Sequence, residues 1–327
     1  MTPERVGELL ERAAGVRVLV VGDLMLDRYI SGPVDRVSPE APVPVVRVEE
    51  EGSAIGGAGN VAANVTSLGP SCRVIGYAGD DPEGELLLGA LEACGVQTDG
   101  VERTDERPTT VKTRVLARHQ QIVRFDREVE HDVSPDLADT LASSVMRLAG
   151  ESDVLIIQDY NKGVLAPVVI RAVLNAAVTH GIPSVVDPKR RNFFSYPGAT
   201  VFKPNAKELE DALGEFLRPD DPEWMEAIRQ RLDCEYLLLT LGDRGMALQT
   251  REGRLVRVPT AAAGVYDVSG AGDTVTAAVA TALAAGGTAT EAAELANHAA
   301  AVEVGKAGVA TVSPSEIKAH VQAHADS

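Results

Sequence analysis

The stretch Val268–Thr274 reads VSGAGDT, and a run of small helix formers, VTAAVATALAAG, comes directly after it. Glycines on both sides of Ala271 let the backbone approach another group closely, and a helix start attracts negative charge. Ser269 could supply an ordinary helix cap, so a plain turn into a buried helix is one interpretation. Asp273 favours a second one, because an acid at an anion-binding helix start is typical of a catalyst placed beside a phosphate.

Outside this stretch, short runs rich in Val, Ile and Leu alternate with longer segments of helical period. The predicted strands are 16–23, 72–80, 153–160, 183–189, 199–204 and 236–242. The predicted helices lie near 3–14, 58–68, 83–94, 135–148, 166–180, 205–213, 222–233, 271–285, 289–305 and 314–324. Near-continuous apolar strands separated by helices predict an α/β fold: one domain over residues 1–327, with a mostly parallel sheet covered by helices on both faces.

Polar residues stand at the carboxyl ends of the predicted strands. They are Asp23, Asp80, Asp159, Asp187, Asn205 and Thr240. A single acid after a strand is usually a helix cap. Ligands of open α/β sheets bind beyond the carboxyl ends of the strands, so a row of such residues predicts the rim of an active site.

Two regions, 28–52 and 107–126, interrupt the alternation of strands and helices. Both contain alternating, β-branched segments with few helical features. They predict antiparallel strands outside the main sheet, in the form of a small flap. Extra edge strands of the main sheet are the alternative.

Composition limits the possible partners and the compartment. The formal net charge is -17, so bulk charge does not favour nucleic acid or anionic lipid, and an anionic substrate needs a local cluster of Lys and Arg. The three cysteines are scattered without CxxC spacing, which indicates buried thiols in a reducing compartment. The charged N-terminus lacks a signal peptide's apolar run and no stretch is long enough to span a membrane, so a cytoplasmic protein is expected. The histidines show no ligand spacing and are interpreted as core or surface residues.

Three further motifs each have two interpretations. The segment GAGNVA, Gly57 to Ala62, fits a dinucleotide fingerprint, but it does not follow the first strand, which disfavours a dehydrogenase. Asn205 to Glu208, NAKE, could be a capping box or could hold water around Mg²⁺ near a nucleotide. The loop TLGDRG, 240–245, suits a cover over phosphates or ribose, or an ordinary hairpin. A Walker A sequence, a GxSxG elbow and an HExxH motif do not occur in the sequence.

Taken in order, GGAGN, KPNAKE, TLGDRG and DVSGAGDT resemble the ribokinase-like (PfkB) carbohydrate kinases. The segment DRYISGPVDRVSPEAPVPV, with RHQQIVRFD, DYNKGVL and DPKRRNFFSYPGAT, is similar to the D-glycero-β-D-manno-heptose 7-phosphate kinases of bacterial ADP-heptose synthesis. The resemblance covers about residues 16–314. The chain departs from the family pattern at GGAGN, where these kinases often have a second alanine, and at TLGDRG, where their loop is more variable.

The resemblance implies a role for each motif. The backbone of Gly270, Ala271 and Gly272 would hold the transferring γ-phosphoryl group, and Asp273 would act as the base. The implied ATP-binding residues are Asn205, Ala206, Lys207, Glu208, Thr240, Gly242, Gly245 and Asn297. Mg²⁺ would be held by Asn205 and Glu208 through water. The implied sugar-binding residues are Asp23, Asp27, Gly56, Gly57, Asn60, Lys112, Asp159 and Lys162.

The resemblance also implies the substrate and the assembly. The expected reaction is ATP-dependent phosphorylation of the heptose 7-phosphate at C1, with another sugar, sugar-phosphate or nucleoside kinase, or a silent sugar-phosphate-binding protein, as alternatives. The two flap segments would form a β-lid that also builds a homodimer interface. Many such kinases are fused to a nucleotidyltransferase domain with an H-x-G-H signature; none follows here, so a stand-alone kinase is expected. The basic residues available for the distal phosphate are Lys112, Arg114, Arg118, Arg124, Lys162, Lys189, Arg190 and Arg191.

Overall fold

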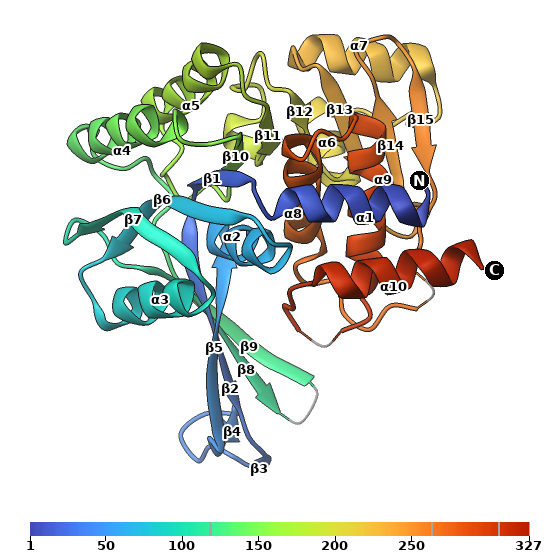
Figure 1. The fold of residues 1–327 in the computed structure, drawn as a ribbon. Coiled ribbons are helices and arrows are strands. Elements are labelled where there is room, and N and C mark those ends of the chain that lie inside the picture. The colour runs from blue at the N-terminus through green and yellow to red at the C-terminus, as the bar shows by residue number, and fades with distance from the viewer. Residues whose placement is uncertain (118–119, 263, 307, 327) are drawn as a thin grey trace.

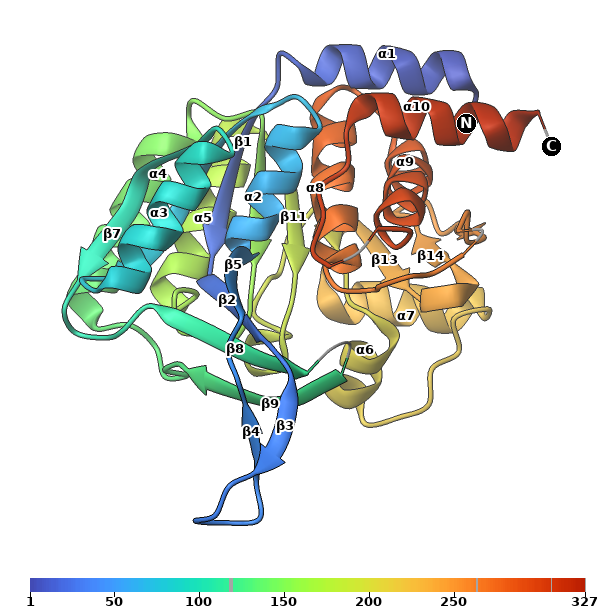
Figure 2. The same cartoon turned by 90° about the horizontal axis from the view of Figure 1, so that it is seen from below.

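The apolar runs of the sequence form one nine-stranded sheet. Its strands run across the molecule from β7 to β15 in Figure 1, and Figure 2 shows the same sheet turned by 90°. The structure is a computed structural model that describes residues 1–117, 120–262, 264–306 and 308–326. The strand order is β15-β14-β13-β12-β11-β10-β1-β6-β7. The six predicted strands pair in parallel at its centre: β1 (Arg17–Gly22), β6 (Ser71–Gly79), β10 (Val154–Gln158), β11 (Ser184–Asp187), β12 (Val201–Phe202) and β13 (Tyr236–Thr240).

The edges of the sheet hold three strands that the sequence did not predict. Strand β7 (Val96–Thr104) extends the parallel order beyond β6, while β14 (Met246–Gln249) and β15 (Leu255–Val258) pair in antiparallel fashion beyond β13. The loop TLGDRG, which includes the short 3₁₀ helix Gly242–Arg244, joins β13 to β14 and is therefore a hairpin connection.

Helices cover both faces of the sheet, which confirms the predicted architecture. One face carries α1 (Pro3–Ala13), α2 (Ala58–Ser67), α3 (Pro82–Ala93), α8 (Ala271–Ala284), α9 (Ala289–Glu303) and α10 (Pro314–Ala325). The other carries α4 (Pro135–Ala149), α5 (Pro167–His180), α6 (Ala206–Leu213) and α7 (Pro222–Leu232). Side chains alternate along each strand, so Val18 and Val20 of β1 enter the first core while Leu19 and Val21 enter the second.

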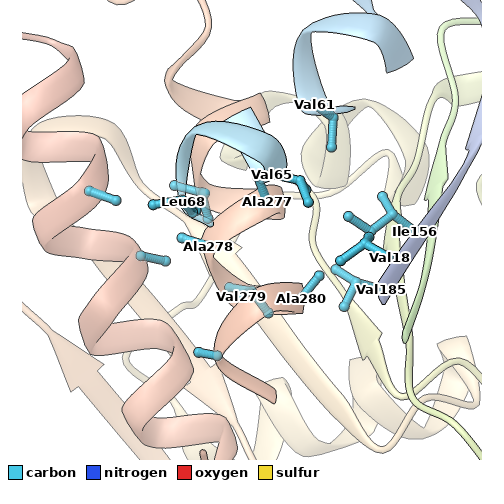
Figure 3. Packing of buried hydrophobic residues seen from close by; sticks show 14 of the residues in the cluster. Val18, Val61, Val65, Leu68, Ile156, Val185, Ala277, Ala278, Val279 and Ala280 are labelled. Carbon is cyan, nitrogen blue, oxygen red and sulfur yellow. The ribbon is translucent and has the colours of Figure 1, made fainter. Parts of the chain in front are cut away.

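The buried alanines of α8 explain how closely this helix packs against the sheet. Ala277, Ala278 and Ala280 are fully buried, and Figure 3 shows α8 packed beside Val61 and Val65 of α2, against the valines of the sheet. Small side chains let two helices and a sheet approach closely without leaving a void. The first turns of α8 lie at the carboxyl ends of β10 and β11, where Asp273 contacts Gln158 and Thr276 contacts Asp187.

The two interrupting segments form a second sheet, called the lid here. Its strand order is β5-β2-β8-β9, and a two-stranded hairpin extends it. The elements are β2 (Leu24–Ser31), β5 (Glu50–Gly57), β8 (Thr110–Ala117), β9 (Gln120–Arg127) and the hairpin β3 (Val34–Val37) with β4 (Pro44–Val46). The antiparallel prediction was wrong for β2 and β8, which pair in parallel. Each of them directly follows a parallel strand of the main sheet, so both leave it in the same direction (Figure 1).

The exposure of the cysteines and the apolarity of the helices bear on two expectations from composition. Cys72 and Cys234 are buried free thiols, whereas Cys94 is exposed at the end of α3, so the prediction was wrong for that residue. Among the described residues, no helix combines the length and apolarity that crossing a bilayer requires.

Candidate active site

Asp273 lies in the first turn of α8 with only 7% of its surface exposed. The N-cap is Gly270, with a φ of 98°, and no side chain of the described residues caps this helix. Ser269, the possible cap, instead donates its backbone N–H to Asp267 at 2.9 Å. Glycine is required at 270 because L side chains rarely adopt this φ. The first N–H groups of a helix lack intrahelical partners, so this start presents donors to an anion.

The Asp273 carboxylate accepts hydrogen bonds from three side chains of distant segments. Asn60 Nδ2 of α2 lies 2.7 Å from Oδ2, while Gln158 Nε2 and Tyr160 Oη lie 3.1 and 2.8 Å from Oδ1. Burial raises the pKa of Asp273 to about 6, and the nearby Asp187 carboxylate acts in the same direction, against the hydrogen bonds from Asn60 and Tyr160. The result is a buried carboxylate that is ionised at neutral pH and close to its titration range.

A polar network under Asp273 joins Asp187 of the predicted rim to Gln158, Tyr160 and Lys203, which the sequence did not assign to the site. Asp187, at the end of β11, accepts from Gln158 at 3.0 Å and pairs with Lys203 at 3.1 Å. Two ammonium groups lie over the Tyr160 ring, with Lys112 Nζ and Lys189 Nζ 5.6 and 5.3 Å from its centroid. These contacts are cation–π interactions, which hold the ring in place. Gln158, Tyr160 and Lys203 gave only a positional signal in the sequence, because each stands at or just beyond the carboxyl end of a strand.

Two adjoining cavities meet at the start of α8. A cavity of about 660 Å³ is lined by seven of the residues assigned to the nucleotide: Asn205, Ala206, Lys207, Thr240, Gly242, Gly245 and Asn297. A smaller cavity of about 120 Å³ contains Asp273, Asp187 and the eighth, Glu208. Asn205, Thr240 and Gly272 line both. The structure therefore places the expected nucleotide residues in one cleft that ends at the expected base.

The segment NAKE forms the capping box that was one of its two interpretations. Glu208 N–H donates to Asn205 Oδ1 at 2.8 Å, and Asn205 N–H donates to Glu208 Oε2 at 2.9 Å. The other oxygen of Glu208 pairs with Lys189. A carboxylate has about four acceptor positions, so these contacts leave room for water on the side that faces the small cavity.

Two acids assigned to the sugar hold a loop of the protein itself. Asp23 is 1% exposed and accepts the backbone N–H groups of Tyr160, Lys162 and Val164 at 2.8 to 3.0 Å. Asp159 is equally buried and accepts from Asn161 N–H and from the side chains of Asn192 and Tyr196. These contacts fix the loop that carries Tyr160. Asp23 and Asp159 thus position this loop, and any contact with a sugar would come in addition.

Gly56 and Gly57 of β5 allow a close approach, but the group that comes close is the neighbouring strand β2. Gly57 has a φ of 60°, and a Cβ there would lie 2.3 Å from the Asp23 carbonyl oxygen. A Cβ at Gly56 would lie 2.7 Å from Asp27 Oδ2. Asp27 itself pairs with Arg114 of β8. The resemblance implied a sugar ligand at these glycines, whereas the structure shows that they let β5 lie against β2.

The predicted rim is interrupted at one position. Asp80, beyond β6, forms an exposed ion pair with Arg103 at 2.9 Å. Both residues line a separate surface cavity, which shares no residue with the two cavities at α8. The strand order explains the difference, since β6 lies beyond β1 and away from β11 to β13.

Three of the histidines lie together, although the sequence was interpreted as having no ligand spacing among them. His298 of α9 and His320 and His324 of α10 lie together, with one potential ligand atom of each within 4.8 Å of the others. Burial, with a contribution from the two neighbouring rings, lowers the pKa of His298 to about 4. His320 and His324 are four residues apart on a helix, which was a ligand spacing visible in the sequence.

Comparison with known proteins gives matches over nearly the whole chain. The model described as pfkB family carbohydrate kinase matches residues 16–316. The bifunctional protein HldE of Pelobacter propionicus is 44% identical over 330 residues, covering 100% of this chain and 68% of that protein. HldE of Citrifermentans bemidjiense is 43% identical, covering 98% of this chain and 66% of that protein. The chain spans about two thirds of the length of these relatives.

Solved structures share the fold. Phosphofructokinase-2 from Escherichia coli, solved in complex with potassium, has a TM-score of 0.77 at 22% identity and covers 95% of this chain and 99% of its own. Arabidopsis thaliana ribokinase, solved with ribose and ATP, has a TM-score of 0.74 at 22% identity and covers 94% of this chain and 99% of its own. The fold is ribokinase-like, as predicted.

Proposed function

Because the chain belongs to the pfkB family of carbohydrate kinases, we propose that it transfers the γ-phosphoryl group of ATP to C1 of D-glycero-β-D-manno-heptose 7-phosphate, giving the 1,7-bisphosphate for ADP-heptose synthesis. The observation that carries the proposal is the position of Asp273, where the nucleotide cleft meets the start of α8. The choice of sugar rests on the resemblance of the early and middle segments to the heptose kinases.

In this proposal ATP occupies the larger cavity. Its adenine lies toward Asn297, and its phosphates run along Thr240 and Asn205 to the start of α8. The backbone of Gly270, Ala271 and Gly272 accommodates the transferring group, whose charge spreads over its equatorial oxygens. Lys189 and Lys203, which line the small cavity, add positive charge there.

The residues present fit a magnesium ion held through water. Glu208, Asn205 and Asp187 bring oxygen ligands to the small cavity, and Mg²⁺ keeps several waters and needs few protein ligands. The ion would neutralise the phosphate oxygens. Asp187, which the sequence assigned only to the rim, belongs to this set because it shares the cavity with Glu208.

Asp273 supplies the base. Its Oδ2 atom accepts one hydrogen bond, from Asn60, and so retains a lone pair for a sugar hydroxyl. As the C1 oxygen attacks the γ-phosphorus, its proton passes to Asp273, and ADP leaves. A sugar hydroxyl is far less acidic than a carboxylic acid, so the proton moves late in the reaction.

The proposal is tested by measuring Mg²⁺-dependent ADP release across a panel of sugar 7-, 6- and 5-phosphates, free sugars and nucleosides. The heptose 7-phosphate should give the highest kcat/KM. A higher value with a hexose phosphate or a nucleoside would assign the chain to another activity of the family. ATP binding without turnover of any sugar would indicate a silent sugar-phosphate-binding protein.

The pKa of Asp273 predicts how activity depends on pH. The raised value, about 6, belongs to a base that must be ionised to act, so activity is present above pH 6 and lost below it. We expect kcat/KM to fall about tenfold per pH unit below about pH 6, because this parameter reports the free enzyme. Burial, reinforced by Asp159, also raises the pKa of Asp23 to about 6, so near-ultraviolet circular dichroism should be followed over the same range to detect loop opening. A profile that stays flat to pH 5 would contradict the assignment of the base.

We further propose that the lid builds a homodimer. Val37, Val123 and Phe125 of the lid are 65%, 48% and 56% exposed, and a second lid would cover apolar side chains of this kind. Light scattering at micromolar concentration should give twice the 34.4 kDa of one chain. The variant Phe125→Asp should shift the mass toward the monomer, whereas Phe216→Asp, at an 88% exposed residue outside the lid, should not. A wild-type mass near that of one chain would rule out the shared lid.

A further inference from the structure

Three histidines meet where α9 and α10 pack together, outside both cavities of the active site. His298 Nδ1 lies 3.1 Å from His320 Nδ1, and the ring centroids of His320 and His324 are 4.3 Å apart. His320 and His324 are one turn apart on α10, so they share a helix face. Helices α9 and α10 lie side by side in Figures 1 and 2, near the N-terminus of the chain.

The nitrogen atoms are close enough for shared coordination. One potential ligand atom from each ring lies within 4.8 Å of the others. A tetrahedral ion with bonds of about 2.0–2.1 Å to imidazole needs nitrogens about 3.4 Å apart, so small rotations of the three rings, of which only His324 is exposed, would bring the nitrogens around an ion. Facing Nδ1 atoms at 3.1 Å cannot both carry a proton, so at least one of these rings presents a lone pair.

The surroundings supply room for a bound ion. A cavity of about 270 Å³ is lined by His298 and His324, and Glu294 lines it one turn before His298 on α9. The Glu294 carboxylate pairs with the Met1 ammonium at 2.6 Å, which limits the repulsion that this ammonium would exert on a cation. The cavity is large enough for water as a fourth ligand.

We propose that His298, His320 and His324 form a binding site for a divalent transition-metal ion of the zinc class, with water from the adjoining cavity completing the coordination. Imidazole favours zinc, cobalt, nickel and copper, whereas magnesium and calcium prefer oxygen ligands. The magnesium required by the proposed kinase reaction therefore does not compete for this site. The ion would hold α10 against α9. Its ligand His298 follows Asn297, which lines both this cavity and the nucleotide cleft.

The test uses the full chain without a polyhistidine tag, stripped of metal and kept in millimolar Mg²⁺. Titration with Zn²⁺ should show one site, and Co²⁺ should produce the visible absorption of a nitrogen-ligated ion. Loss of an outer-shell partner typically weakens metal binding 10- to 100-fold, so losing a ligand in His320→Gln or His324→Gln should weaken it at least about a hundredfold. His180→Gln, at an exposed histidine of α5, is the matched control and should bind as the wild type does.

Thermal unfolding gives a second readout. Saturating Zn²⁺ should raise the Tm of the wild type and of His180→Gln by about 4–8 °C, and should leave the Tm of His324→Gln unchanged. His324 is exposed, so the metal-free variant should fold normally. Equal Zn²⁺ affinity and stoichiometry in the wild type and in both variants of α10 would overturn the proposal, as would a wild type that binds no Zn²⁺ at micromolar concentration.

Discussion

Replacing Asp273 with asparagine is expected to lower kcat by about two to four orders of magnitude, the usual contribution of a positioned general base. The amide keeps the size of the carboxylate and one of its acceptor atoms, but it cannot take the proton of the attacking hydroxyl. Helix α8 is held by its buried alanines, not by residue 273, so the fold and ATP binding should persist. Initial rates of ADP release and calorimetric titration with ATP measure the two quantities separately.

The matched control is Asp139→Asn, an exposed acid of α4 on the opposite face of the sheet, which should retain wild-type kcat. Circular dichroism and thermal unfolding should show that both variants are folded. An Asp273→Asn variant that keeps more than a tenth of wild-type kcat would remove this residue from the mechanism.

The central sheet and its helices could be predicted because their signals are local. Each central strand is a short apolar run, and several helices begin at a cap with proline or glutamate in the first turn, as Ser134 and Ser313 show. Strand β7, VQTDGVERT, has no such run because it lies at the edge and is partly polar. The parallel pairing of β2 with β8 depends on where β1 and β7 end in space, which no local pattern records.

The candidate site was predictable in its motifs and not in its contacts. Asp273 could be identified from the glycines around it and from its place at a helix start. Its bonds to Gln158 and Tyr160 join residues more than a hundred positions apart, and they depend on which way each side chain leaves its strand end. Asp23 shows the opposite error: its position at a strand end suggested a ligand, yet its oxygens are occupied by backbone N–H groups.

The distal phosphate of the substrate is expected to raise kcat/KM by on the order of a hundredfold or more, the equivalent of about 2.7 kcal/mol. A dianionic phosphate gains several charge-assisted hydrogen bonds, each contributing roughly 1.5–3 kcal/mol. The measurement compares the heptose with and without its 7-phosphate under the same ATP and Mg²⁺. Similar values for the two would favour a kinase of free sugars.

The ion pairs narrow the choice among the eight basic residues considered for this phosphate. Most of those described already pair with carboxylates: Arg114 with Asp27, Arg124 with Asp126, Lys162 with Glu128 and Glu130, Lys189 with Glu208, and Arg191 with Asp132. Arg118 lies outside the described residues. Lys112 and Arg190 form no ion pair with any described residue. Arg190 is exposed, whereas Lys112 lies over the Tyr160 ring and has its pKa lowered by burial. A bound phosphate would compensate the Lys112 ammonium for the hydration that burial removes. We therefore expect Lys112 to be the residue that binds the distal phosphate.

The variant Lys112→Met therefore tests where the distal phosphate binds as well as how much it contributes to kcat/KM. It should lower kcat/KM for the heptose 7-phosphate by about 10- to 150-fold, equivalent to the loss of one charge-assisted hydrogen bond, and leave the unphosphorylated heptose nearly unchanged. Lys318→Met, at an ammonium on α10 that pairs with Glu11, is the control and should alter neither substrate. An equal loss for both sugars would mean that Lys112 acts on the reacting end through Tyr160. The phosphate would then have to displace Glu128 and Glu130 from Lys162, and Lys162→Met would become the variant that separates the two substrates.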